Sequence, residues 1–291
     1  MKKKVALVLS SGSSRGLASI GAIEALEEHG YEISSVAGCS MGAIVGGMYA
    51  AGKLKELKEW YMQMTLKRMW ELSDFTLSTS YLLHGERIMQ ALSELIPDYK
   101  IEDLRMPLAL IATDMQTGRE IVFRSGSLSH AIRASFSIPL VLEPVRDGKM
   151  LLMDGGITNA LPLNRVARTE GDILVSVNVS APDLPRKEEE KQEPSWLERM
   201  LEQRNLKPTM FKRGTGAERL GYAALMNKVN DIMIQQHCEL IKQLCPPDIN
   251  IDIAMNQFGM FEYDHAETII AFGKEKMQAA IAEYEAKAMR S

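Results

Sequence analysis

A serine between small residues is the first feature of this sequence that could do chemistry. Ser40 lies in Gly38-Cys39-Ser40-Met41-Gly42, which fits the pattern Gly-x-Ser-x-Gly. The two glycines allow a sharp turn, and a turn between a strand and a helix would expose the hydroxyl at a helix N-terminus. Free N–H groups there favour developing negative charge. The pattern predicts a nucleophilic serine, with a tight turn and a capping serine as the alternative.

A serine hydroxyl needs a base to remove its proton, and the sequence offers two kinds. His237 and His265 follow Ser40 in the chain order of a serine–acid–histidine triad, although such hydrolases place several strands before their nucleophile. Asp154-Gly155-Gly156 follows an apolar run. At the carboxyl end of a strand, this carboxylate would lie where open α/β sheets hold their active groups. A turn aspartate is the alternative.

A run of small residues near the N-terminus could bind an anion. The segment Ser10-Ser11-Gly12-Ser13-Ser14-Arg15-Gly16 lies between a predicted strand and a predicted helix. Successive N–H groups there can form a concave anion site, and Arg15 adds a positive charge. The segment lacks the Gly-Lys-Ser/Thr ending of a Walker loop and most glycines of a dinucleotide fingerprint. An oxyanion or a phosphate is the expected ligand.

Alternating strands and helices must position these residues. The alternation predicts an α/β fold: a layered α/β/α arrangement with a mostly parallel central sheet. Apolar runs and helical spacing predict strands at 5–9, 35–38, 108–112, 121–123, 150–153 and 173–179, and helices at 15–29, 41–51, 54–69 and 85–96.

The chain changes character after residue 180. Residues 181–193 carry prolines and a dense mixed-charge run, which is typical of a solvated linker. Helical spacing follows at 196–206, 218–244 and 266–286, around a possible strand at 250–253. We therefore expect a catalytic core over 5–180, and over 181–291 a linker with a mainly helical C-terminal extension that packs on the core.

Composition excludes several classes of protein. The 291 residues are 46% hydrophobic and 25% charged, which suits a large buried core. A formal charge of -4 gives no field for a nucleic acid, so we expect no nucleic-acid partner. The three cysteines show no zinc or redox spacing, and no metal or cofactor is predicted. Apolar runs are too short for export or for spanning a bilayer, which predicts a soluble, cytoplasmic protein.

The Ser10–Gly16 loop, the Ser40 pentapeptide and Asp154-Gly155-Gly156 together resemble, in order and spacing, the patatin-like phospholipases. Segments 36–47, 112–118 and 133–139 also resemble that family, so the resemblance covers about residues 5–180. It implies a hydrolase of lipid or lysophospholipid acyl esters, with Ser40 as nucleophile, Asp154 as general base and no histidine. It implies an oxyanion hole from the N–H groups of Gly12, Ser13 and Met41. The supporting motif residues are Arg15, Gly16, Gly38, Gly42, Gly155 and Gly156.

The chain departs from the family where serines replace glycines at positions 10, 11 and 13. Serine reaches positive φ only at a cost, although it keeps its N–H. An ordinary aspartate, with a pKa of about 3.9, is a weak base, so oxyanion stabilisation must supply most of the rate. Two alternatives stay open: a catalytically weak or inactive acyl- or anion-binding module of the same fold, and a histidine-dependent serine esterase.

Aromatic and methionine side chains gather in two places. We interpret both groups as helix packing, with an acyl-chain groove or an interfacial face as the alternative. Peripheral membrane contact would then use exposed side chains such as Trp196 and Phe211. Cys39 and the His237, Cys238 and Cys245 group are interpreted as packed residues. The two groups are Trp60, Tyr61, Met62, Met64, Met69 and Trp70, and then Trp196, Met200, Met210 and Phe211.

Overall fold

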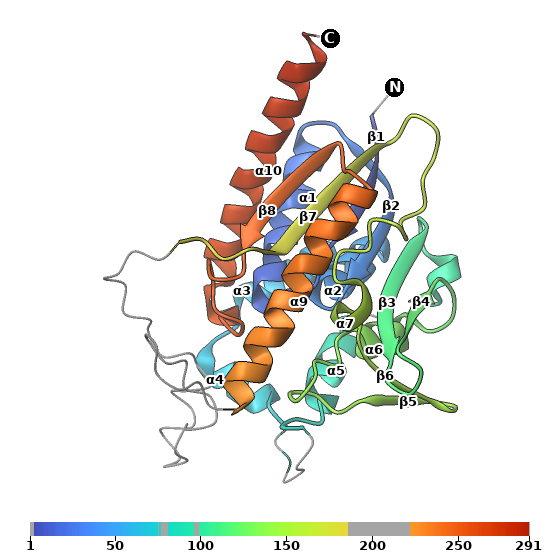
Figure 1. Cartoon of the computed structure of the whole chain (residues 1–291), viewed down its shortest axis with the longest axis vertical. Helices are drawn as coiled ribbons and strands as arrows, with labels where there is room; N and C mark the ends of the chain where they lie inside the picture. Colours follow the sequence, from blue (N-terminus) through green and yellow to red (C-terminus); the bar gives the residue numbers. More distant parts are fainter. Residues whose placement is uncertain (1–2, 75, 77–80, 96–98, 186–221, 291) are drawn as a thin grey trace.

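A single mixed sheet forms the centre of the protein. The structure is a computed structural model, and it describes residues 3–74, 76, 81–95, 99–185 and 222–290. The strand order is β5-β6-β3-β2-β1-β7-β8, with β4 pairing with β3 (Figure 1). The bounds are β1 (Lys4–Leu9), β2 (Glu32–Cys39), β3 (Leu108–Asp114), β4 (Arg119–Phe123), β5 (Val145–Asp147), β6 (Met150–Asp154), β7 (Ile173–Ala181) and β8 (Ile249–Ala254).

The strand directions divide the sheet into two parts. The ladder from β3 through β2, β1 and β7 to β8 is parallel throughout, whereas β4, β5 and β6 pair in antiparallel fashion. The predicted mostly parallel α/β fold is therefore confirmed. Asp154 ends an antiparallel strand, so it reaches the end of the sheet at which β2 stops from the opposite direction to β2.

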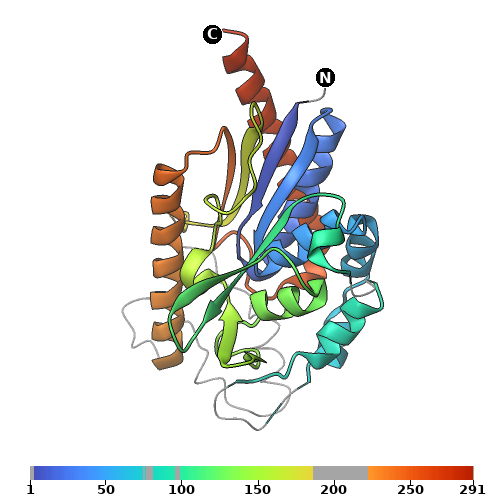
Figure 2. The same cartoon turned by 90° about the vertical axis from the view of Figure 1, so that its right-hand side faces the viewer.

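Helices cover both faces of this sheet (Figure 2). α1, α2 and α10 lie on one face, and α7 and α9 lie on the other. The α-helices are α1 (Ala18–Glu28), α2 (Met41–Ala50), α3 (Leu54–Met62), α4 (Leu66–Leu72), α5 (Glu86–Ser93), α6 (Leu128–Ser135), α7 (Gly156–Asn159), α9 (Tyr222–Leu244) and α10 (Ala266–Ala288). Short 3-10 turns are η1 (Ser13–Leu17), η2 (Ile101–Asp103) and η4 (Tyr263–His265).

The alternation of side chains along β1 explains the two layers. Val5, Leu7 and Leu9 join the core beneath α1, α2 and α10, while Ala6 and Val8 join a second core beneath α7 and α9. Successive side chains of a strand point to opposite faces, so an unbroken apolar run requires cover on both.

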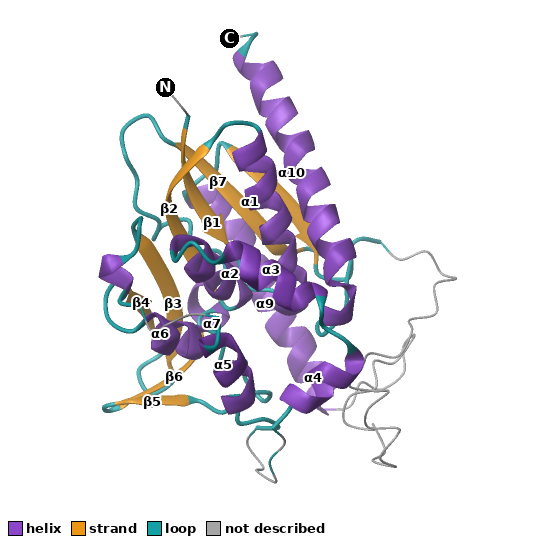
Figure 3. Cartoon of the chain, turned by 180° about the vertical axis from the view of Figure 1, so that it is seen from behind, coloured by secondary structure: helices purple, strands orange, loops and turns teal. Residues whose placement is uncertain are grey.

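The C-terminal part of the chain is built into this core. β8 extends the parallel ladder beyond β7, and α10 packs along α1 (Figure 3). The two helices approach so closely that only glycine fits at two positions. A Cβ at Gly21 would lie 1.9 Å from the Ile270 carbonyl oxygen, and a Cβ at Gly273 would lie 2.0 Å from the Ala18 carbonyl oxygen. None of the helices in the described ranges combines the length and apolar character that crossing a bilayer requires.

Several predicted elements differ in detail. The predicted helix at 54–69 is two helices, because Thr65 caps α4 by accepting a hydrogen bond from the Arg68 N–H at 3.2 Å. The predicted helix at 15–29 begins as the 3-10 turn η1. α6, α7 and β5 were not predicted. The predicted helix at 196–206 lies outside the described residues.

Candidate active site

Ser40 occupies a strained turn between β2 and α2. Its φ is 55° and its ψ is -119°, a conformation that a residue with a Cβ adopts only at a cost. The turn needs glycines, since a Cβ at Gly38 would lie 2.3 Å from the Gly42 carbonyl oxygen, and one at Gly42 would lie 2.3 Å from that of Leu9. The Ser40 N–H donates to Ser135 Oγ at 2.9 Å, which fixes the turn from α6.

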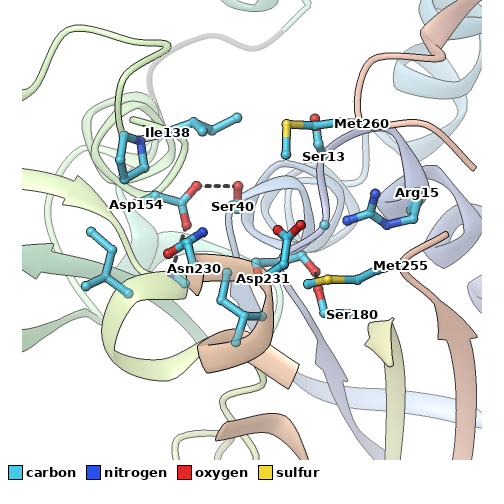
Figure 4. Close-up of a pocket in the computed structure, with 16 residues that line it drawn as sticks. Ser13, Arg15, Ser40, Ile138, Asp154, Ser180, Asn230, Asp231, Met255 and Met260 are labelled. Atoms are coloured by element: carbon cyan, nitrogen blue, oxygen red, sulfur yellow. Dashed lines mark hydrogen bonds between the residues drawn. The ribbon is translucent and has the colours of Figure 1, made fainter. Parts of the chain in front are cut away.

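The Ser40 hydroxyl points at the carboxylate of Asp154 (Figure 4). Ser40 Oγ donates to Asp154 Oδ2 at 2.5 Å. The strand pairing explains this proximity, because Cys39 pairs with Ile111 of β3 and Asp154 pairs with the next residue, Ala112. The two residues that the sequence singled out are thus in direct contact.

The surroundings of Asp154 change its acidity. Its side chain is buried, and burial raises the pKa of Asp154 to about 6, against the lowering effect of the hydrogen bonds that it accepts. The Gly156 N–H donates to Oδ1 at 2.7 Å, and the Cys39 thiol lies 3.8 Å from the same oxygen. Gly155 lies against β3, where a Cβ would meet the Ile111 carbonyl oxygen at 2.4 Å.

A pocket lies beside Ser40, and the loop of residues 10–16 contributes N–H groups to it. The Ser10 and Ser11 amides donate to Val177 and Ala160 carbonyls at 3.1 and 2.8 Å. Within the described ranges, the amides of Gly12 and Ser13 have no protein acceptor, and both residues line the pocket with Ser40. These two amides are therefore available to a bound oxyanion.

Ser13 shows the predicted conflict between serine and loop geometry. Its φ is 51°, whereas neither Ser10 nor Ser11 has a positive φ. Its hydroxyl is 3.0 Å from the hydroxyl of Tyr263, which lies in η4. A tyrosine from the C-terminal part of the chain thus holds the one loop serine that adopts the left-handed conformation.

Arg15 and Gly16 support the loop in different ways. The buried Arg15 side chain donates from Nε to the Val179 carbonyl at 3.0 Å and from Nη1 to that of Phe258 at 3.4 Å, and it lines the pocket. Gly16 packs against Met41. A Cβ at position 16 would lie 2.4 Å from the Met41 side chain. Met41 is the buried first residue of α2 and does not line the pocket, so its N–H as a third donor stays a prediction.

The C-terminal part of the chain closes the pocket, which the sequence did not reveal. Asn230, Asp231 and Ile234 of α9 line it, together with Met255 and Met260 (Figure 4). These residues are far from Ser40 in the sequence and carry no motif. Their contribution depends on the tertiary packing of α9 and β8.

Histidines lie elsewhere. All five belong to the described residues, and none lines the pocket of Ser40. His84 contacts Glu143 at 2.7 Å, His130 contacts Asp147 at 3.3 Å, and His29 contacts its own helix. The structure does not bring His237 or His265 to the pocket.

The cysteines are buried or half-buried thiols. Cys39 and Cys238 are fully buried, and burial raises the pKa of Cys238 to about 12 and that of Cys39 well above its usual range. A thiol with a raised pKa is a poor nucleophile at neutral pH. Among the described residues, no group of three or more histidine, cysteine and carboxylate side chains is arranged to hold a metal ion.

Four of the six residues in the first aromatic and methionine group line a second hollow, and Met62 and Trp70 do not. Trp60, Tyr61, Met64 and Met69 are buried around it, whereas Met62 is exposed to solvent. The second group, Trp196, Met200, Met210 and Phe211, lies outside the described residues.

A family profile described as patatin-like phospholipase matches residues 7–167, more than half of the chain. An uncharacterized NTE family protein of Mycobacterium tuberculosis is 41% identical over 200 residues, which is 68% of this chain and 56% of that protein. Mouse patatin-like phospholipase domain-containing protein 6 is 34% identical over 187 residues, which is 62% of this chain and 14% of that protein.

The matched region therefore spans little more than half of the mycobacterial relative and a small part of the mouse protein. Among solved structures, the crystal structure of VipD from Legionella pneumophila aligns over 97% of this chain and 67% of its own. The TM-score is 0.50 and the identity 13%, so this likeness is one of fold.

Proposed function

The chain belongs to the patatin-like phospholipase family, and from that premise we propose that it hydrolyses the acyl esters of lipids or lysophospholipids with a Ser40–Asp154 dyad. Family membership supports lipid acyl hydrolysis in general. The hydrogen bond from Ser40 Oγ to Asp154 Oδ2 carries the finer proposal, because it joins a nucleophile to its base inside a pocket with free amides.

The first half of the reaction acylates the serine. Ser40 Oγ forms a bond to the ester carbonyl carbon as its proton passes to Asp154 Oδ2, and the carbonyl electron pair moves onto oxygen. The amides of Gly12 and Ser13 then donate to this oxyanion, a role in which one lost donor typically costs about 2.7–4 kcal/mol of transition-state stabilisation. The intermediate collapses, and the leaving alcohol takes the proton from Asp154.

The second half releases the acid. Asp154 accepts a proton from a water molecule whose oxygen attacks the acyl carbon, and the same amides hold the second oxyanion. Collapse breaks the bond to Ser40 Oγ, which recovers its proton from Asp154. A single carboxylate thus acts as base and then as acid in each half.

Burial makes Asp154 suited to this work. A general base is most effective when its pKa lies near the working pH. Burial raises the pKa of Asp154 to about 6, so the carboxylate is a stronger base than an exposed aspartate and is still ionised at neutral pH.

Two other functions compete with this one. A module that binds acyl groups or anions without turnover would retain the loop and the pocket, and the strain at Ser13 favours it. A histidine-dependent esterase would need an imidazole beside Ser40, and the positions of the five histidines weigh against it.

Contact with a lipid surface is a further part of the proposal. α9, which lines the catalytic pocket with Asn230, Asp231 and Ile234, also carries apolar side chains exposed to solvent. Leu225, Val229, Ile232, Met233 and Leu240 are 41–63% exposed and recur at helical spacing along one stripe. A stripe on the helix that borders the pocket would place a membrane or micelle surface next to the site.

A fluorophosphonate probe and a short-chain p-nitrophenyl ester test the proposed function together. We expect labelling of Ser40 alone, located by mass spectrometry, and turnover that Ser40→Ala and Asp154→Asn each reduce by about a thousandfold or more. The double variant should be scarcely worse, because the two residues act as one unit. Ser93→Ala, at an exposed serine of α5, is the matched control.

The outcomes separate the three functions. The absence of both labelling and turnover would favour the binding module, and an adduct on another residue would overturn the assignment of Ser40. Multiplicative losses in the double variant would contradict the dyad.

A further inference from the structure

One segment of the C-terminal part of the chain holds the loop of residues 10–16. Residues 258–263 follow β8 and precede α10, and they hydrogen-bond to three successive residues of the loop, beside the pocket of Ser40 (Figure 4). The contacts run from Ser14 N to the Met260 carbonyl (3.2 Å), from Ser14 Oγ to the Gly259 carbonyl (2.7 Å), from Arg15 Nη1 to the Phe258 carbonyl (3.4 Å), and between the hydroxyls of Ser13 and Tyr263 (3.0 Å).

The 258–263 segment is itself fixed at both ends. β8, which precedes it, pairs with β7 in the sheet, and α10, which follows it, packs along α1 (Figure 3). The loop of residues 10–16 leads into α1, so the loop and the segment both adjoin the same pair of packed helices. A side chain on the segment therefore keeps its place relative to the loop.

Ser13 is the loop residue whose contact depends on a side chain of the segment. Backbone carbonyls accept the hydrogen bonds from Ser14 and Arg15, whereas Ser13 meets the hydroxyl of Tyr263. Ser13 also has a φ of 51°, a conformation that is roughly 5–30 times less populated for a residue with a Cβ. The strain of the loop and its side-chain contact thus occur at the same residue.

The φ of Ser13 decides where its N–H points, because φ is the rotation about the bond from N to Cα. Ser14 is fixed to backbone carbonyls through its N–H and its hydroxyl. A change in the φ of Ser13 would therefore turn the peptide group before it, which carries the Ser13 N–H. This N–H is one of the two amides that the proposed mechanism assigns to the oxyanion.

We infer that Tyr263 is a positioning residue, whose hydroxyl holds Ser13 in the left-handed conformation and so directs the Ser13 N–H at the oxyanion. This inference rests on the proposed function. The serine brings strain to a position where glycine would have none, and its hydroxyl supplies the contact that opposes the strain. Tyr263 lies beyond residues 7–167, which match the family profile.

Tyr263→Phe tests this inference, because it removes the hydroxyl and keeps the ring that stacks on Tyr61 with centroids 5.8 Å apart. A donor to the oxyanion acts mainly in the transition state. We therefore expect kcat for p-nitrophenyl butanoate to fall by about three- to tenfold, with KM within about twofold of wild type. Ser13→Ala should lose as much, and the double variant no more, because both changes remove one hydrogen bond.

Glycine at position 13 separates positioning from a general loss of packing. Glycine adopts a φ of 51° freely, so it needs no tyrosine to hold it. In the Ser13→Gly background, Tyr263→Phe should therefore change kcat by less than about twofold, whatever the activity of Ser13→Gly itself. A tyrosine that only supported the fold would lower kcat by the same factor in both backgrounds.

The pH dependence provides a further check on the role of Tyr263. Burial raises the pKa of Tyr263 to about 12, so its hydroxyl stays protonated over the working range. A hydroxyl that positions the loop takes no part in proton transfer. The pH–rate profile of Tyr263→Phe should therefore keep the shape of the wild-type profile, and a shifted acid limb would overturn the inference.

Tyr31→Phe is the matched control. Tyr31 is buried, its hydroxyl donates to Glu285 Oε1 of α10 at 3.0 Å, and it does not line the pocket of Ser40. The variant removes another hydroxyl contact to the C-terminal part of the chain, and it should leave kcat unchanged. An unchanged kcat in Tyr263→Phe, an equal loss in Tyr31→Phe, or a loss that persists with glycine at position 13 would overturn the inference.

Amide hydrogen exchange makes the test independent of turnover. In the Ser40→Ala protein, peptides that cover residues 10–16 should exchange faster when Tyr263 is changed to phenylalanine. This difference should disappear when residue 13 is glycine, and Tyr31→Phe should not produce it. Equal exchange with and without the Tyr263 hydroxyl would overturn the inference.

The two proposals can fail separately. Ester turnover that is indifferent to Tyr263→Phe would leave the hydrolase standing and remove the role of Tyr263. A wild type that turns over no ester would remove the hydrolase. Faster exchange in Tyr263→Phe, cancelled by Ser13→Gly, would in that case still keep Tyr263 as the residue that holds Ser13.

Discussion

Ser40 and Asp154 meet across a single strand. The residue before Ser40 pairs with Ile111 of β3, and Asp154 pairs with Ala112 of the same strand, so backbone pairing sets the 2.5 Å contact between hydroxyl and carboxylate. Groups held on paired strands keep their geometry better than groups on loops. The loop of residues 10–16 is different, because its Ser13 is held by one tyrosine from a distant part of the chain.

The pH dependence of hydrolysis should follow Asp154. The base works only when ionised, and burial raises the pKa of Asp154 to about 6. We expect kcat/KM to be level above that pH and to fall by about tenfold per pH unit below it. A pH–rate profile with a short-chain ester, corrected for reversible inactivation, measures this. A level profile down to pH 4 would contradict Asp154 as the base.

The buried carboxylate of Asp154 should also lower the free energy of unfolding when it is ionised. Its pKa in the folded protein, about 6, exceeds the ordinary value of about 3.9, so between these values the folded state binds the proton more tightly. Stability therefore falls as pH rises through this window. Asp154→Asn should raise the free energy of unfolding above pH 6 by up to roughly 3 kcal/mol, with the gain vanishing near pH 4.

Urea unfolding at several pH values checks the prediction for Asp154. Asp103→Asn, at an exposed position in η2, is the control for the exchange of aspartate for asparagine. A destabilised Asp154→Asn at pH 8 would mean that the carboxylate contributes more through its hydrogen bonds than its burial costs.

Strain at Ser13 should be measurable by comparing two small residues. Ser13→Ala loses the hydrogen bond to Tyr263 but keeps a Cβ at φ 51°, whereas Ser13→Gly loses both the bond and the strain. The glycine variant should therefore be more stable than the alanine variant by roughly 1–2 kcal/mol. Thermal and urea unfolding of both variants measure the difference.

Ser11 provides the control, because its φ is not positive. There the glycine variant should be no more stable than the alanine variant. Equal stabilities of Ser13→Ala and Ser13→Gly would show that the loop relaxes around the side chain.

The histidines should be dispensable for turnover. His237 and His265 do not line the pocket of Ser40, so His237→Gln and His265→Gln should each keep kcat within a few-fold of wild type. In a triad, loss of the histidine costs several orders of magnitude. A folded single variant that loses about a thousandfold in kcat would remove Asp154 as the direct base.

The exposed stripe on α9 should bring the protein to lipid. We expect part of the wild type to float with vesicles, and Ile232→Glu combined with Met233→Glu to reduce the floating fraction, because both side chains are exposed and apolar. Gln278→Glu adds a charge at an exposed position of α10, away from the stripe, and controls for charge. Wild type that stays lipid-free with every vesicle composition would exclude this contact.

The site residues that could be predicted from the sequence are those whose neighbours in the chain form a local pattern. The turn around Ser40 and the Asp154-Gly155-Gly156 segment each carry their geometry in neighbouring glycines, so local patterns identified both. The strands β1 and β7 were also predictable, because burial on both faces demands unbroken apolar runs.

Residues brought in by tertiary packing left no such pattern. Tyr263 and Asn230 reach the site only because β8 and α9 pack on β7, and neither has a neighbour that marks it. Ser135, which accepts the Ser40 N–H, lies on a helix of eight residues whose one local signal was the capping Ser127. The break between α3 and α4 had a similar signal in Thr65.

The contact between α1 and α10 has a consequence for how the protein is made. The backbone around Gly21 packs against Ile270, so the apolar face of α1 stays uncovered on the ribosome until α10 has emerged. Domains fold as units during synthesis, and exposed apolar surface in the meantime invites aggregation or chaperone binding. The nascent chain thus exposes an unfinished core from the synthesis of α1 until α10 has emerged.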